Sequence, residues 1–226
     1  MEEKTSMILP EWIETQLSQG REFRQMQPME VREAQDGEED QMVIEGYACT
    51  FNEFYTLFDW GDYVVQEQID ARAFDECDMS DFILQVDHHG KVYARNRNKT
   101  ITAEPDEHGL HVRGTLAGVS GGGDLYSDIK GGYYDRMSFA FTVKEDKREV
   151  IEDHETGKVV VKRTITKIAK LYDVSVVSFP ANDATEIFAR GMADGAISWA
   201  AQEVRAFEAR RKAQQRLRLK LKLMEV

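Results

Sequence analysis

The chain has 226 residues, enough for one domain with extensions or two small domains, and its 42% hydrophobic and 31% charged residues are typical of a soluble globular protein. No apolar run approaches the roughly 18 residues of a membrane-spanning helix, so we expect neither a membrane partner nor, at the acidic N-terminus, a secretory signal. The net charge of −12 combines −17 over residues 1–200 with +5 over residues 201–226, and so acidic a body argues against specific nucleic-acid binding.

The first predicted elements follow an N-terminal arm over residues 1–20. Residues 43–51 and 82–88 are typical of β-strands with one buried face. Two further strands, at 99–104 and 110–116, are predicted to form a hairpin, because proline, aspartate and glycine lie between them.

A short helix is predicted next, over residues 124–130. Leu125 and Ile129 lie on one face of it, and the two glycines that follow are a usual helix end. The chain then continues with a strand that contains Ser138, a hairpin that turns at residues 153–157, and a last strand at 170–179.

Many short strands with one or two helices predict an α+β, mainly β fold. We expect a closed or partly open, antiparallel-rich β-barrel or sandwich over residues 21–190, flanked by helices. From residue 185 the composition turns to alanine, glutamate, arginine and glutamine, which predicts a helical and basic C-terminal extension over residues 191–226.

Two predicted strands carry a polar, reactive side chain where the alternation predicts burial. In residues 82–88 the alternation places His88 on the apolar face and leaves His89 on the polar one. In the last strand Asp173 shares its predicted face with Leu171, Ser175, Val177 and Phe179. A buried carboxylate must be paired or hydrogen-bonded, so Asp173 is expected to have a partner.

The strand that contains Ser138 alternates in an unusual way. Met137, Phe139 and Phe141 are large and apolar, whereas Ser138 and Ala140 between them are small. A solvent face normally carries longer polar side chains, so the small face predicts open space above Ser138.

A serine, an inward histidine and a half-buried aspartate suggest nucleophilic acyl transfer. A serine hydroxyl is a weak nucleophile that needs a base, imidazole is the usual base, and a carboxylate fixes the imidazole tautomer. Taken singly, each residue also has a structural interpretation. Ser138 is then a small strand residue, His88 a hydrogen-bonded core residue, and Asp173 the partner of a buried arginine or the cap of a turn.

Metal binding is a weaker interpretation. His88, His89 and His111 are the candidate ligands, but neighbouring histidines on a strand point to opposite faces. Cys49 and Cys77 are too far apart for a zinc knuckle or a disulfide framework and indicate a reducing, intracellular setting. We therefore expect no metal and no cofactor.

Several segments resemble, in order along the chain, motifs of the caudovirus prohead serine proteases, the phage capsid-maturation proteases of the HK97 type. They are residues 46–51 (GYACTF), 72–74 (RAF), 87–88 (DH), 109–112 (GLHV), 137–141 (MSFAF) and 171–181 (LYDVSVVSFPA). The last two are the most specific. The family is similar in fold to the herpesvirus assemblins.

The resemblance implies a serine endopeptidase with Ser138 as nucleophile, His88 as base and Asp173 as third member. It implies that scaffold and major capsid protein, and the protease itself, are cleaved inside the phage prohead in the host cytoplasm. A homodimer is expected by analogy with assemblins. The alternatives are an inactive capsid-assembly or scaffolding factor of the same fold and, less favoured, a small-molecule esterase, since Ser138 does not lie in a Gly-x-Ser-x-Gly elbow.

The sequence departs from the family pattern at three positions. Ala140 stands where glycine is usual, Asp173 where glutamate is commoner, and His89 where aspartate is frequent. None of these changes removes a catalytic atom. Donors to the oxyanion are expected from the loop at residues 121–123 or from the region of Arg136.

The basic C-terminal extension ends in an alternation of cationic and aliphatic residues over 216–223. Helical spacing would spread this charge around the axis, so the pattern favours a strand or a segment that folds on binding. It is either a solvated terminus or a docking segment for scaffold or capsid protein.

Overall fold

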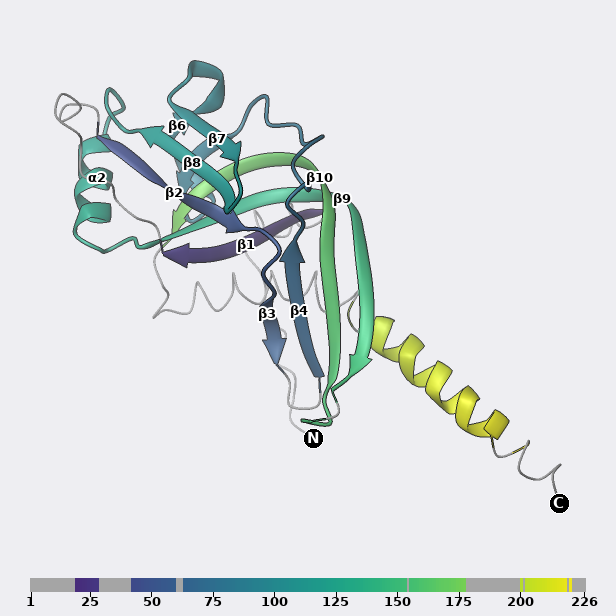
Figure 1. Cartoon of the computed structure of the whole chain (residues 1–226). Coiled ribbons are helices and arrows are strands. Elements are labelled where there is room, and N and C mark those ends of the chain that lie inside the picture. The colour runs from purple at the N-terminus through teal and green to yellow at the C-terminus, as the bar shows by residue number, and fades with distance from the viewer. Residues whose placement is uncertain are drawn as a thin grey trace.

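The computed structural model describes residues 19–28, 42–59, 63–153, 155–177, 200, 202–218 and 220, and the structural statements below refer to these residues. Their strands are β1 (Arg21–Pro28), β2 (Val43–Thr50), β3 (Tyr55–Asp59), β4 (Tyr63–Ile69), β5 (Ile83–Val86), β6 (His89–Arg95), β7 (Ile101–Pro105), β8 (Gly109–Thr115), β9 (Arg136–Glu152) and β10 (Val159–Val177). The helices are the 3-10 turn η1 (Asn96–Asn98), α2 (Gly122–Lys130) and a C-terminal helix over residues 202–218. The arrangement is shown in Figure 1.

The strands form two separate sheets. The larger has seven strands, with the order β1-β9-β10-β4-β3, and the hairpin of β5 and β6 pairs onto β10 as well. The smaller has the order β2-β8-β7. The prediction of a mainly β fold with helices is confirmed, but a closed barrel is wrong among the described strands, because each sheet ends in edge strands that pair on one side only.

The long hairpin of β9 and β10 is the spine of the larger sheet (Figure 1). It measures 17 residues in β9 and 19 in β10, and the sequence pattern had divided each strand into two. Four register shifts interrupt the β9–β10 pairing, and each one resets the alternation from which strands are recognised. The first part of β10 pairs in parallel with β4 and the last part with β5, so one strand serves two neighbours along one edge.

The core lies against one face of this spine. Met137, Phe139 and Phe141 are fully buried there, and the rings of Phe139 and Phe141 stack with centroids 4.6 Å apart. Helix α2 adds Leu125 and Ile129, which are buried as the sequence predicted. The small sheet covers the same cluster with apolar residues of β2 and β8. The small-residue face of β9 therefore looks away from the core.

The C-terminal helix begins against the far end of the hairpin and extends away from the sheets (Figure 1). Ala200 is buried beside Val65 and Val161, and the Tyr63 hydroxyl donates to Glu208 Oε1 at 2.9 Å. Residues 216–218 continue the helix, so the strand predicted there is wrong. The preceding residues are strong helix formers without glycine or proline, and the helix propagates through them. None of the described helices is long and apolar enough to cross a membrane.

Candidate active site

Ser138 lies near the start of β9, between two neighbouring strands. It pairs with Gln25 of β1 on one side and with Ser175 of β10 on the other. Residues directly opposite in a sheet share a face, so the side chains of Ser138 and Ser175 point the same way, opposite to Phe139. Ser138 has 0% of its surface exposed.

Asp173 reaches the same face through an irregularity in β10. Leu171 pairs with Phe141 but Asp173 pairs with Ala140, so two steps along β10 match one step along β9. Such a bulge moves the following side chains to the other face. The prediction that Leu171 and Asp173 share a face is therefore wrong: Leu171 belongs to the core cluster with Phe141. Phe179, also expected on that face, lies outside the described residues.

His88 is buried as predicted, with 2% exposed, but strand alternation is not the reason. Strand β5 ends at Val86, which pairs with His89, so Asp87 and His88 form the two-residue turn of a hairpin. Both have positive φ, 49° and 56°. A turn of two residues with positive φ is the tight hairpin connection that fits the twist of the strands. Here it places the imidazole on the Ser138 face, while His89 is exposed at the start of β6.

The structure brings the three predicted residues into contact. His88 Nδ1 lies 2.5 Å from Asp173 Oδ1, and His88 Nε2 lies 2.6 Å from Ser138 Oγ. An ionised carboxylate only accepts, so Nδ1 carries the proton and donates it to Asp173. The unprotonated Nε2 then accepts from the Ser138 hydroxyl. This is the arrangement in which imidazole can take the proton of an attacking serine.

Two neighbours complete the site. The ring of Phe23, from β1, meets the His88 ring edge-on with centroids 4.9 Å apart and covers it. Ser175, fully buried, donates its hydroxyl proton to Asp173 Oδ1 at 2.9 Å and accepts from the His88 backbone N–H at 3.1 Å. Sequence reasoning placed Ser175 on the face of Asp173 but gave it no role. A second polar residue on a predicted buried face was the available signal.

A buried ionic cluster lies on the opposite face, beside the Phe141 ring. Glu67 of β4 accepts from Arg24 of β1 and from Arg163 of β10, the latter at 2.9 Å. Glu22 binds both guanidinium groups at 2.6 Å. Burial raises the pKa of Glu22, but the guanidinium groups of Arg24 and Arg163 outweigh it and lower that pKa to about 2. The cluster therefore ties β1, β4 and β10 of the larger sheet together, and the sequence did not predict it.

The two regions expected to supply oxyanion donors lie in different elements, one on β9 and the other at the start of α2. Arg136 lies two residues before Ser138 on β9 and so on the same face. Gly121 precedes α2 with φ 70°, and Gly122 and Gly123 begin that helix.

The candidate metal ligands do not come together. In the part of the chain that the structure describes, no group of three or more histidine, cysteine, aspartate or glutamate residues could hold a metal ion. His111 Nε2 instead lies 2.9 Å from Glu45 Oε1.

Comparison with known proteins identifies the family. Residues 27–196 match the family described as Caudovirus prohead serine protease, a range that includes His88, Ser138 and Asp173. The chain belongs to this family. It is 32% identical over 160 residues to the prohead protease of Enterobacteria phage HK97, a match that covers 70% of this chain and 64% of that relative.

The match thus spans less than two thirds of the HK97 prohead protease. Among solved structures, the capsid assembly protease of bacteriophage T4 aligns over 71% of this chain and 99% of that chain, with 11% identity and a TM-score of 0.38. A likeness that low carries no structural argument, so the site of this prohead protease family member rests on its own geometry.

Proposed function

We propose that the chain is a serine endopeptidase that processes scaffold and major capsid protein, and itself, during phage prohead maturation. The observation that supports this most is the continuous relay from Asp173 through His88 to the Ser138 hydroxyl, with contacts of 2.5 and 2.6 Å. The relay lies within the segment that matches the prohead serine protease family.

The geometry supports acyl transfer in two steps. Ser138 Oγ attacks a peptide carbonyl carbon as its proton passes to His88 Nε2, and Asp173 stabilises the imidazolium that forms. The C–N bond then breaks, His88 gives the proton to the leaving amine, and the acyl group remains on Ser138. Water, activated by the same imidazole, releases the acyl group as a carboxylic acid and restores the serine.

The site is covered in this arrangement, because neither the Ser138 hydroxyl nor the His88 ring is open to solvent. A substrate carbonyl therefore reaches Ser138 only after the cover moves. Phe23 of β1, which packs on the His88 ring, is one part of that cover. We expect the oxyanion to be stabilised by backbone N–H groups near Arg136 or Gly121.

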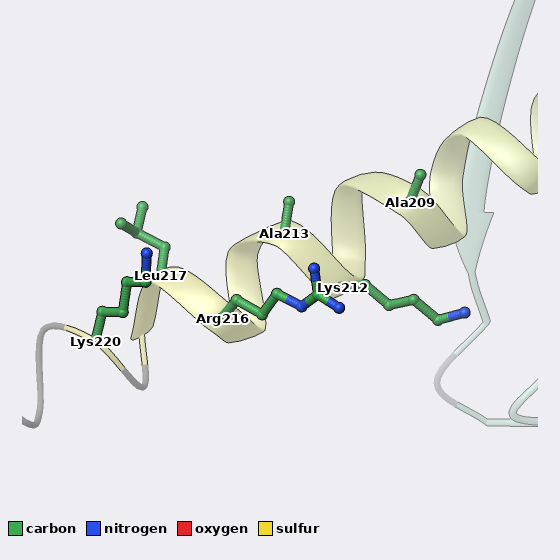
Figure 2. Close-up of a pocket in the computed structure, with 6 residues that line it drawn as sticks. All are labelled: Ala209, Lys212, Ala213, Arg216, Leu217 and Lys220. Carbon is green, nitrogen blue, oxygen red and sulfur yellow. The ribbon is translucent and has the colours of Figure 1, made fainter.

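The partners are proposed from charge and shape. The C-terminal helix carries two parallel rows of residues spaced by four, one small or aliphatic and one cationic (Figure 2). The rows are Ala209, Ala213 and Leu217, and Lys212, Arg216 and Lys220. We propose that this basic face docks on acidic residues of scaffold or capsid protein and brings the protease into the prohead in the host cytoplasm. We also propose a protease domain over residues 21–190, a separate C-terminal extension, and a homodimer.

Co-expression with the cognate major capsid protein tests the function. Intact-mass analysis should show shortened capsid or scaffold chains with the wild type and full-length chains with Ser138→Ala. Ser127→Ala, which removes an exposed hydroxyl on α2, is the matched control and should behave as the wild type. Full-length chains in all three samples, with heads still assembled, would instead support the inactive assembly factor.

A further inference from the structure

Ser175 contacts two members of the relay through one hydroxyl group. Its Oγ lies 2.9 Å from Asp173 Oδ1 and 3.1 Å from the backbone nitrogen of His88. We propose that Ser175 is a positioning residue, which fixes the carboxylate of Asp173 and the turn that carries His88 in one geometry. As a statement about catalysis the proposal rests on the proposed function.

The direction of both hydrogen bonds follows from the groups involved. The backbone N–H of His88 can only donate, so Ser175 Oγ accepts from it, and an ionised Asp173 can only accept, so Oγ donates its proton there. Asp173 Oδ1 thus receives Ser175 Oγ–H and His88 Nδ1–H together. A carboxylate oxygen held by a second donor cannot swing away from the imidazole, and the tautomer with Nε2 facing Ser138 is kept.

The contact with the backbone holds an unusual turn. Asp87 and His88 both have positive φ, a conformation that residues with a side chain adopt at a cost unless their surroundings hold them. Strand β10 supplies two acceptors to this turn, the carbonyl oxygen of Val176 for Asp87 N–H at 3.1 Å and Ser175 Oγ for His88 N–H. The Ser175 hydroxyl therefore holds His88 through the backbone of His88 and holds Asp173 through the carboxylate of Asp173.

Packing alone does not account for a hydroxyl at this position. Ser175 is fully buried between Val174 and Val176 of the same strand, directly opposite Ser138. Alanine would fill nearly the same volume, and a buried hydroxyl is costly unless it is hydrogen-bonded. Both hydrogen bonds that the structure gives Ser175 Oγ go to relay residues.

The test compares Ser175→Ala with the hydroxyl-retaining Ser175→Thr in the full-length chain. One readout is saturation kinetics with a fluorophosphonate, which forms a covalent bond with an activated serine. We expect Ser175→Ala to slow the covalent step by about tenfold to a hundredfold, as lost supporting hydrogen bonds commonly do, with the half-saturating concentration unchanged. Ser175→Thr should recover most of the rate, and Ser127→Ala should match the wild type.

The second readout does not depend on activity. We expect the proton on His88 Nδ1, held by Asp173, to give a far-downfield proton resonance in NMR, which should move or broaden in Ser175→Ala and stay in place in Ser175→Thr. Should Ser175→Ala fail to fold, Ser175→Cys keeps the volume with a much weaker hydrogen bond and should show the same loss.

The outcomes separate the two proposals. An unchanged covalent rate and an unchanged Nδ1 resonance in Ser175→Ala would overturn the positioning role. If the wild type itself does not react with the probe, the proposed function fails, and the resonance alone then decides whether Ser175 positions His88 and Asp173.

Discussion

Ser138 and Ser175 lie directly opposite each other on β9 and β10, and this register pair sets the whole site. One of the two hydroxyl groups meets His88 Nε2, and the other meets the backbone nitrogen of His88. His88 is therefore held from both strands of the long hairpin, through its imidazole and through its backbone. A slip of one strand by one residue would place the two hydroxyl groups on opposite faces of the sheet.

Asp173→Asn should slow fluorophosphonate labelling of Ser138 by about a thousandfold or more, because an amide favours the wrong imidazole tautomer. The fold should be kept, since the substitution conserves the shape. Time-resolved intact-mass spectrometry measures the labelling rate. A rate within a few fold of the wild type would show that Asp173 is not part of the relay.

Asp173→Glu tests whether the site, with its bulge in β10, requires the shorter side chain of aspartate. The contact between Asp173 Oδ1 and His88 Nδ1 is already 2.5 Å, so an added methylene must displace the imidazole. We expect labelling to fall by about tenfold, on the order of 1.4 kcal/mol in the barrier. Labelling faster than that of the wild type would show that the site has room for the longer side chain.

Glu67→Gln should destabilise the fold by about 3–5 kcal/mol, because it leaves the buried guanidinium groups of Arg24 and Arg163 without their central carboxylate. Urea unfolding followed by circular dichroism measures the loss. Glu104→Gln, at an exposed position of β7, is the control and should change stability by less than about 0.5 kcal/mol. Equal midpoints for the two variants would mean that the cluster does not hold the larger sheet together.

The stability of the fold should depend on pH through Glu22. Its pKa is lowered from 4.5 to about 2 in the folded chain, so its stabilising effect is complete above pH 4.5 and is lost as the pH falls towards 2. Melting temperatures between pH 2 and pH 6 should therefore drop more steeply in the wild type than in Glu22→Gln. Parallel curves for the two proteins would contradict this assignment.

Lys212→Glu combined with Arg216→Glu should reverse the charge of the C-terminal helix face and reduce the amount of protease packaged into proheads (Figure 2). Covalent labelling of Ser138 in the purified variant should not change, because the face lies on the extension beyond the sheets. Quantitative mass spectrometry of purified proheads gives the packaged amount. Normal packaging of the double variant would show that this face does not dock the protease in the prohead.

The sequence predicted the three relay residues and the burial of His88, because His88 and Asp173 are polar residues on predicted apolar faces and Ser138 lies on a face of unusually small residues. It could not show how His88 is buried, since a two-residue turn depends on the pairing of Val86 with His89 and on strand β10 beside it. The bulge before Asp173 was hidden for a similar reason. Predicting faces from alternation assumes a strand without bulges. The extra residue between Leu171 and Asp173 is evident only from the pairing of β10 with β9.

The ionic cluster could not be predicted at all. Arg24 and Glu67 are 43 residues apart and Glu67 and Arg163 are 96 apart, so nothing local in the sequence connects them. They meet because β1 and β4 lie on the two sides of the β9–β10 hairpin. The length of that hairpin was missed because the register shifts break its pattern into shorter strands.

The most direct test of the relay is the site of covalent modification. The purified chain is treated with a fluorophosphonate, digested, and mapped by tandem mass spectrometry beside His88→Ala. We expect one adduct, on Ser138, in the wild type, and its near-complete loss in His88→Ala, since the hydroxyl then has no base. An adduct of equal yield in both proteins, or a wild-type chain modified at other serines but not at Ser138, would contradict the account.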